Sequence, residues 1–298
     1  MKNILIIGCG LLGSSLLRQI KRKKITKKIY IYEKSKVNIS KIKKLKLPGT
    51  IIDKLQDGVT NSDLIILCTP MSEYKNLILK MNKFLSPKTV VTDVGSSKLE
   101  TSKIIKKFLR KDIFWTSSHP IAGSEVSGPE HGKHDLFQNK WCILIKEKKT
   151  NKDHLIILNK FWKKIGSKVA SMSPEKHDMI FSITSHLPHL IAYNLVKSAQ
   201  DFEKQKNYNL IKYSAGGLRD FSRIAASNEI MWRDIFFYNN KNMSKAIDLF
   251  IKNLNSFKKD INSKNNSSIL EKLIKTKKVR SKIIKLKQDI NKPDFGRS

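Results

Sequence analysis

His119 is the residue of this chain whose type and surroundings point most directly to chemistry. It lies in Ser117-Ser-His-Pro-Ile-Ala-Gly-Ser-Glu125, where a proline and a glycine restrict the backbone and predict a rigid turn. An imidazole held in such a turn can exchange a proton with a bound ligand near neutral pH. A lone histidine in a loop is more often a solvated surface group, so its role depends on what else the chain contains.

Further candidates for substrate chemistry follow later in the chain. Histidines cluster in His177-Asp178 and in Thr184-Ser-His-Leu-Pro-His189, and Arg223 lies in an apolar stretch. A guanidinium can bind a carboxylate through two parallel N–H bonds. We expect no metal in this cluster, because no cysteine or carboxylate completes a ligand set around the histidines.

The chain opens with a dinucleotide-binding fingerprint. The apolar run Asn3–Ile7 predicts a buried strand, and a helical pattern over Ser14–Lys23 follows a GxGxxG sequence. Glycines in this context allow a tight turn, close approach of the backbone to a pyrophosphate, and close packing of helix on strand. The helix N-terminus favours the anion. The residues expected to contact the cofactor are Gly8, Gly10, Leu11, Leu12 and Gly13.

The end of the second predicted strand bears on the choice of cofactor. Lys28–Tyr32 reads as a strand and is followed by Glu33, 20 residues after Gly13. A carboxylate there accepts hydrogen bonds from the ribose 2′-OH and repels a 2′-phosphate, which favours NAD. NADP stays open, because Lys34-Ser-Lys36 can cradle a phosphate. Thr69-Pro70, at the end of a later buried strand, are also expected at the cofactor edge of the sheet.

Strand and helix patterns alternate over the first part of the chain and predict an α/β fold, an N-terminal Rossmann domain with a doubly wound parallel sheet. Helical patterns dominate after Met172, which predicts an all-helical C-terminal dimerisation domain. The long helix at 175–196 is expected to be interrupted at Pro188. The resulting domains are residues 1–172, 173–262 and a Lys-rich extension, 263–298. The expected helices of the second part include 220–226, 229–239, 245–257 and 269–286.

Composition restricts the class of protein. The formal net charge is +34, from 59 basic and 25 acidic residues, but the lysines are spread along the chain rather than gathered on one element. This pattern favours a solvated surface that attracts anionic substrates over a specific nucleic-acid partner. No apolar run is long enough to span a membrane, and Cys9, Cys68 and Cys142 lack disulfide or metal spacing. We expect a cytoplasmic protein with reduced thiols.

Several of these segments together resemble the prephenate/arogenate (cyclohexadienyl) dehydrogenase family. The resemblance runs from residue 1 to about residue 260, in the family's order and at similar spacing. GxGxxG alone is shared by a very large class, whereas the joint match is specific. The matching strings are Asp93-Val-Gly-Ser-Ser-Lys98, Ser118-His-Pro-Ile-Ala-Gly123, His177-Asp178, Thr184-Ser-His-Leu-Pro-His189, Gly216-Gly-Leu-Arg-Asp-Phe-Ser-Arg-Ile-Ala225 and Met231-Trp-Arg-Asp234.

The resemblance implies an oxidative decarboxylation. Hydride passes from the ring carbon that bears the hydroxyl to a nicotinamide, and the ring carboxylate leaves as CO2. By resemblance, His119 receives the hydroxyl proton, and Ser96 shares this hydroxyl with the histidine. The sequence also allows Ser96 to be only the N-cap of the helix that follows.

The resemblance also places a set of residues at the substrate. Arg223 matches a carboxylate-binding position, although an arginine here can instead be an internal ion-pair partner, for example of Asp178. His186 and His177 are equally compatible with hydrogen-bonded core positions. Trp232 matches a residue contributed across the interface of a homodimer formed by the helical domain, or is ordinary packing. The substrate-binding candidates are His189, Arg223, Gly216, Trp232, Glu125 and His186.

Two other functions remain open at this stage. One is a different two-domain NAD(P)-dependent dehydrogenase acting on a small hydroxy acid. The other is a Rossmann protein that senses nucleotides or binds nucleic acid, which leaves His119, Ser96 and Arg223 without a purpose. No residue decides between the pyruvyl side chain of prephenate and the alanyl side chain of arogenate.

Overall fold

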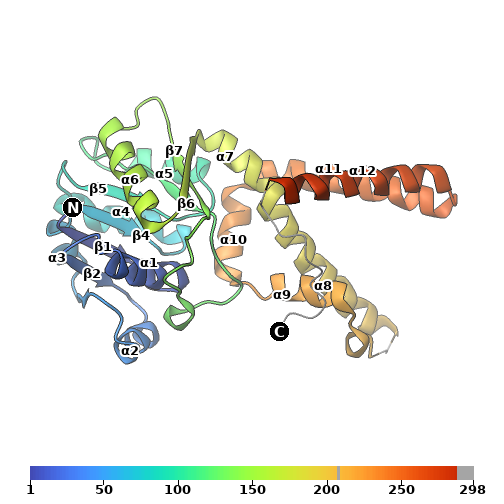
Figure 1. The fold of residues 1–298 in the computed structure, drawn as a ribbon, viewed down its shortest axis with the longest axis horizontal. Coiled ribbons are helices and arrows are strands. Elements are labelled where there is room, and N and C mark those ends of the chain that lie inside the picture. Colours follow the sequence, from blue (N-terminus) through green and yellow to red (C-terminus); the bar gives the residue numbers. More distant parts are fainter. Residues whose placement is uncertain (207–208, 287–298) are drawn as a thin grey trace.

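The computed structural model describes residues 1–206 and 209–286. An α/β unit forms the N-terminal part, and long helices extend away from it (Figure 1). The last strand ends at Met172, and the described residues beyond it are helices and their connections. Among these described residues no helix is long and apolar enough to cross a membrane.

A five-stranded parallel sheet is the centre of the N-terminal part, with the strand order β3-β2-β1-β4-β5. Both faces of β1 are buried, since Ile4 and Ile6 point to one core and Leu5 and Ile7 to the other. A strand buried on both sides explains why its sequence is continuously apolar. The strands are β1 (Asn3–Ile7), β2 (Lys28–Tyr32), β3 (Thr50–Ile51), β4 (Leu64–Leu67) and β5 (Val90–Asp93).

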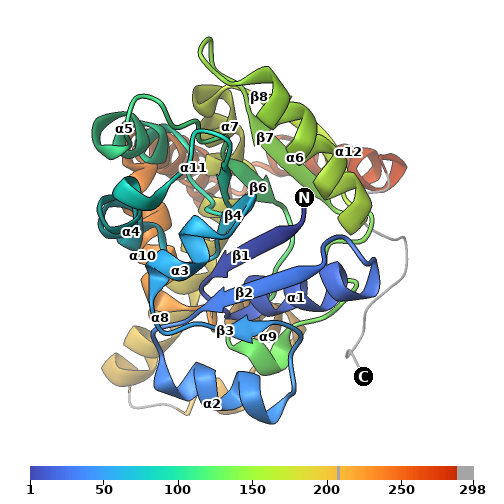
Figure 2. The same cartoon turned by 90° about the vertical axis from the view of Figure 1, so that its left-hand side faces the viewer.

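Helices cover both faces of this sheet, which confirms the predicted Rossmann fold (Figure 2). On one face α1 (Leu11–Arg22) packs with α6 (Lys152–Ile165), and on the other lie α3 (Leu55–Thr60) and α4 (Tyr74–Met81). Helix α2 (Lys36–Lys44) follows β2, and α5 (Leu99–Phe108) follows β5. Short 3-10 helices lie at Met71–Glu73, Asn82–Phe84, Pro129–His131 and Ile211–Tyr213.

A second sheet departs from the single doubly wound sheet that the sequence predicted. It has the order β6-β7-β8, and β6 (Ser118–Pro120) runs antiparallel to β7 (Trp141–Ile145). Strand β8 (Lys168–Met172) is parallel to β7. Among the described residues, only an isolated bridge between Val91 and Trp115 continues the parallel sheet beyond β5. The chain therefore leaves the first sheet before it reaches His119.

The helical part begins with one long run. Helix α7 (Pro174–Phe181) passes through a π-helical segment, Ser182–His186, into α8 (Leu187–Lys206). The predicted interruption at Pro188 is wrong, because the helix continues through it. The wider π turn lies directly before this proline, which lacks an N–H and would crowd the carbonyl four residues earlier in a regular helix.

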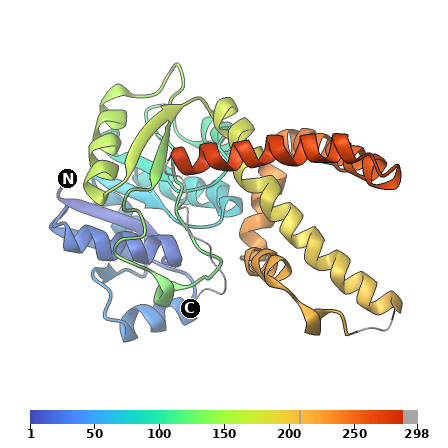
Figure 3. The same ribbon diagram turned by 45° about the vertical axis from the view of Figure 1, so that its right-hand side comes forward.

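The remaining helices are longer than the sequence predicted at several ends. They are α9 (Gly216–Ile224), α10 (Glu229–Tyr238), α11 (Asn240–Asn262) and α12 (Asn266–Lys285). Helix α12 folds back along α11, as the view in Figure 3 makes clear. Asp260 accepts hydrogen bonds from Ser268 Oγ at 2.5 Å and Lys272 Nζ at 2.6 Å, which stabilises this hairpin. The last part of the predicted extension, residues 287–298, lies outside the described residues.

The fingerprint glycines differ in what the fold requires of them. Gly8 has φ +87° and Gly13 packs so closely that an added Cβ would lie 2.2 Å from the Gly8 carbonyl oxygen. At Gly10 an added Cβ would meet no atom within 4 Å. Two of the three glycines are thus needed by the fold itself, while the chain leaves open space at the third.

We predict that Gly13→Ala lowers the free energy of unfolding by about 1–3 kcal/mol, because the helix must move away from the β1 turn. Urea denaturation of both variants provides the measurement. Gly10→Ala is the matched control and should change stability by less than about 0.5 kcal/mol. Equal destabilisation by the two substitutions would contradict this account.

Candidate active site

His119 lies in a strand, not in the rigid turn that the sequence predicted. It is the middle residue of β6, pairs with Ile143 of β7 and is only 7% exposed. The carbonyl of Ser118, the residue before it, accepts a hydrogen bond from Lys98 Nζ at 2.8 Å, which fixes the position of the strand. A short strand fixed by pairing and by a buried lysine gives the imidazole a defined position.

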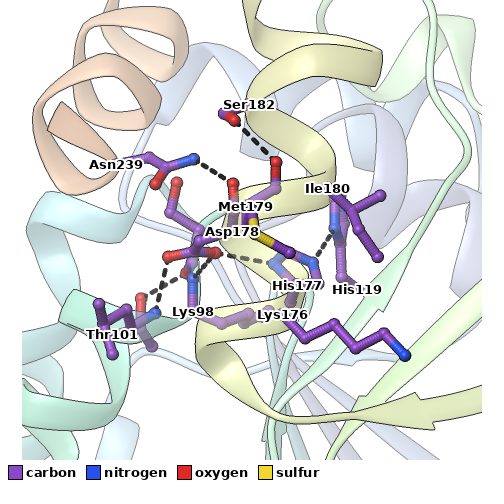
Figure 4. Close-up of polar contacts among 12 residues, drawn as sticks. Lys98, Thr101, His119, Lys176, His177, Asp178, Met179, Ile180, Ser182 and Asn239 are labelled. Atoms are coloured by element: carbon purple, nitrogen blue, oxygen red, sulfur yellow. Dashed lines mark hydrogen bonds and ion pairs between the residues drawn. The ribbon is translucent and has the colours of Figure 1, made fainter. Parts of the chain in front are cut away.

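Three side chains form a hydrogen-bonded series at this point (Figure 4). His119 Nδ1 lies 2.8 Å from His177 Nε2, and His177 Nδ1 lies 2.7 Å from Asp178 Oδ1. His177 and Asp178 are fully buried and come from α7, whereas His119 comes from β6. The site is therefore assembled from both parts of the molecule.

This series determines which nitrogen of His119 is available to a ligand. The Asp178 carboxylate can only accept, so His177 Nδ1 carries its proton and His177 Nε2 becomes the acceptor. His119 Nδ1 must then donate to His177 Nε2. The remaining nitrogen, His119 Nε2, is left with a lone pair. This tautomer is the form that a general base needs.

Asp178 also holds the turn that contains Ser96. Its two carboxylate oxygens accept hydrogen bonds from the backbone N–H groups of Lys98 and Leu99, each at 2.8 Å. These groups begin α5, so Asp178 satisfies the helix N-terminus from another part of the chain. Ser96 is consequently not the N-cap. It lies in the turn between β5 and α5, partly exposed, with its backbone next to His186.

A buried ion pair lies next to the strand that contains His119. Lys98 Nζ is 2.5 Å from Asp93 Oδ2, and both side chains are fully buried. Asp93 is further held by Trp115 Nε1 at 3.0 Å and by the Gly95 N–H at 3.0 Å. Burial above all, together with the positive charge of Lys98, holds the pKa of His119 well below its usual range. His119 is therefore neutral at pH 7, as a proton acceptor must be.

The substrate-side histidines lie on the helical run and contact Trp232. His189 stacks on the Trp232 ring with a centroid distance of 3.8 Å and donates from Nδ1 to the Ser185 carbonyl at 3.0 Å. His186 lies deeper, and its Nδ1 accepts from Asn239 Nδ2 at 3.1 Å. The buried atom Trp232 Nε1 has no hydrogen-bonding partner among the described residues. A polar atom left unpaired in this way is available to a ligand.

Arg223, on α9, forms an ion pair with Glu125 from the loop that follows β6. Arg223 Nη1 lies 3.2 Å from Glu125 Oε1, and their side chains are 44% and 27% exposed. Asp178, which the sequence left open as an alternative partner of Arg223, is instead engaged by His177 and the start of α5. An added Cβ at Gly216, the first residue of α9, would meet no atom within 4 Å.

The carboxyl ends of β1, β2 and β4 surround a separate pocket. Its lining includes four predicted cofactor residues, Gly8, Glu33, Thr69 and Pro70. Glu33 is held in place by the N–H groups of Cys9 at 2.8 Å and Ser35 at 2.9 Å. Thr69 Oγ1 is buried without a partner among the described residues. The open space at Gly10, this orphaned hydroxyl and the fixed carboxylate fit a dinucleotide. Leu11 and Leu12 form the first turn of α1 beside it.

The sequence did not assign the groups that support His119. His177 was left between a core and a ligand role, and Asp178 was considered only as an arginine partner. The adjacent pair His177-Asp178 was the available signal. The contact with β6 depends on the second sheet, which local patterns did not predict. In the part of the chain that the structure describes, no group of histidines, cysteines and carboxylates has a metal-binding arrangement.

Comparisons with known proteins find relatives over both parts of the chain. The family model for the nucleotide-binding domain of prephenate dehydrogenase matches residues 16–171, and the model for its dimerization domain matches residues 173–276. Cyclohexadienyl dehydrogenase of Zymomonas mobilis is 34% identical over 279 residues, covering 94% of this chain and 95% of the relative. Prephenate dehydrogenase of Bacillus subtilis is 31% identical over 257 residues, covering 86% and 69%.

A solved structure is also similar over nearly the whole chain. The crystal structure of prephenate dehydrogenase from A. aeolicus, in complex with hydroxyphenyl propionate and NAD+, has a TM-score of 0.88 and 36% identity. The match covers 95% of this chain and 98% of that chain.

The buried histidines lead to a prediction about acid stability. Burial lowers the pKa of His186 from 6.5 to about 4, so the unfolded chain binds this proton more readily. The stabilisation that comes from keeping His186 neutral in the folded protein is fully present above pH 6.5 and is lost as the pH falls towards 4. Each such histidine makes the free energy of unfolding fall by up to about 1.4 kcal/mol per pH unit in this window.

Urea denaturation between pH 7 and pH 4.5 measures this slope. His186→Gln should reduce the slope, whatever its effect on stability at pH 7. His131→Gln, at an exposed position, is the control and should keep the wild-type slope. An unchanged slope in His186→Gln would show that His186 is not buried in its neutral form.

Proposed function

The chain belongs to the prephenate dehydrogenase family, and we propose that it oxidatively decarboxylates prephenate, arogenate or both, with NAD as the hydride acceptor. The observation that carries this proposal is the series His119–His177–Asp178, which leaves His119 Nε2 free to accept a proton. The family-like sequence motifs, the Rossmann fold and the pocket beside Glu33 also support the proposed reaction.

His119 acts as the general base in this proposal. Its Nε2 takes the proton of the ring hydroxyl, and the positive charge that forms on the imidazole is delocalised towards His177 and Asp178. Ser96, in the turn fixed by Asp178, orients the same hydroxyl. Bound NAD supplies the nicotinamide ring that takes the hydride from the ring carbon. Loss of CO2 then makes the ring aromatic, so the protein mainly has to orient the substrate.

The remaining substrate contacts come from the helical part. Arg223 binds a substrate carboxylate. In the structure its guanidinium is paired with the carboxylate of Glu125, which the substrate would have to displace or share. His189, stacked on the buried Trp232 ring, contributes to the substrate side together with His186 and Gly216. The helices also carry exposed apolar side chains such as Leu249, Leu254 and Leu273. These support a homodimer through the region that matches the family's dimerization domain.

The direct test is NADH formation by the purified protein with prephenate and with arogenate, each repeated with NADP. Turnover with either substrate is the expected result, with NAD preferred because of Glu33. Folded protein that binds NADH but turns over neither substrate would contradict the proposal. The four rates also determine which side chain is accepted.

We predict that His119→Asn lowers kcat by about two to four orders of magnitude, because asparagine can hydrogen bond but cannot accept the proton. Steady-state rates with the preferred substrate measure the loss. NADH binding, followed by fluorescence titration, should stay close to that of the wild type. A kcat within threefold of the wild type, on the order of 0.7 kcal/mol in the barrier, would exclude His119 as the base.

We predict that Arg223→Ala raises the KM for substrate by about tenfold to a hundredfold with a smaller change in kcat, because a charged hydrogen-bonding pair is lost in the ground state and the transition state alike. Arg22→Ala, at the exposed end of α1, is the control. A variant with lowered stability but unchanged KM would assign Arg223 a structural role with Glu125.

A further inference from the structure

An ion pair spans the rim of the pocket that contains Glu33. Lys34 Nζ lies 2.7 Å from Glu73 Oε2. Lys34 follows the end of β2, and Glu73 ends the 3-10 helix that follows β4. Both residues line the pocket together with Gly8, Glu33 and Thr69. The pair therefore joins the two loops between which a Rossmann fold holds the adenosine half of its cofactor.

Among the described residues that line this pocket, Lys34 is the only one with a basic side chain. An ammonium next to Glu33 is well placed to attract a 2′-phosphate, which carries about two negative charges at pH 7. In the structure this ammonium is neutralised by Glu73. Glu73 also adds a second carboxylate to a pocket that already contains Glu33.

The neighbouring polar groups have other partners. Ser35 Oγ accepts the Asn38 N–H at 3.2 Å and caps α2. The Ser35 N–H donates to Glu33 Oε1 at 2.9 Å. The serine that the sequence offered as part of a phosphate cradle is thus engaged in local structure, and Lys34 is engaged by Glu73. Two of the three residues with which the sequence left NADP open, Lys34 and Ser35, therefore have partners within the protein.

We propose that Glu73 is a second determinant of cofactor choice, acting as a positioning residue that withholds Lys34 from a 2′-phosphate. Glu33 repels the phosphate directly, and Glu73 removes the cation that would compensate for this repulsion. Replacement of Glu33 alone should therefore give an incomplete change of preference. This inference rests on the proposed function, since it concerns the cofactor of that same site.

Fluorescence titration with NADH and NADPH tests the inference independently of turnover. The proteins are the wild type, Glu33→Ser, Glu73→Gln and the double variant, all at an ionic strength of about 0.15 M, because salt screens exposed charges. Lys34 and Glu73 are 50% and 38% exposed, so the pair contributes little to folding and Glu73→Gln should remain folded. The readout is the ratio of the two dissociation constants.

Glu33→Ser should shift this ratio towards NADPH by about tenfold, and Glu73→Gln in that background by about tenfold more, as expected when a nearby like charge is removed. Adding Lys34→Met to the double variant should abolish the second gain. Glu271→Gln, at an exposed lysine pair on α12, is the matched control and should leave the ratio unchanged.

Two results would overturn the inference: a ratio that Glu73→Gln does not change in the Glu33→Ser background, or a gain that persists when Lys34 is replaced. In either case wild-type binding of NADH leaves the proposed function standing. Failure of the folded wild type to bind NADH would instead remove the proposed function and this inference together.

Discussion

The carboxylate of Asp178 is the interaction on which the rest of the site depends. It belongs to the helical part, yet it accepts the first N–H groups of α5 and the Nδ1–H of His177. The same two oxygens thus fix the turn that contains Ser96 and the orientation of the histidine that contacts His119. Asn239, which donates to the Asp178 carbonyl at 2.8 Å, connects this point to α11 and His186. The parts of the molecule are joined where the reaction is proposed to occur.

Burial gives this arrangement its chemical properties. The Lys98–Asp93 pair is costly to bury and is retained with several hydrogen bonds, including the one from Lys98 to the strand that carries His119. Desolvation keeps His119 neutral, while the net charge of +34 is distributed over the exposed surface. That surface attracts anionic substrates, an effect that salt weakens. The buried surroundings determine the protonation state of His119, and the charged surface influences how often an anionic substrate reaches the site.

The pattern of apolar residues along the sequence predicted the longer strands of the first sheet. The strands Asn3–Ile7 and Lys28–Tyr32 were predicted to the residue, since their aliphatic side chains are buried in the first sheet. The antiparallel β6 was not predicted, because it depends on pairing with a distant strand. The π turn before Pro188 was not predicted either, because a proline in a helical pattern indicates a break rather than a wider turn. The sequence likewise placed His119 in a turn, because the strand that contains it forms only by pairing with β7. The ion pair that the sequence left open for Arg223 is present, with Glu125 and not with Asp178. The roles of Ser96, His119 and the substrate-side residues remain predictions, which the geometry supports.

The central claim is that Asp178 and His177 fix the tautomer of His119. It is tested most directly by 15N NMR of histidine-labelled protein at pH 7, with the His119 signals identified by their absence in His119→Asn. The account predicts a neutral ring with the proton on Nδ1 and an unprotonated Nε2. In Asp178→Asn this tautomer should no longer be the dominant one. A wild-type His119 that is protonated on Nε2, or charged, would contradict the account.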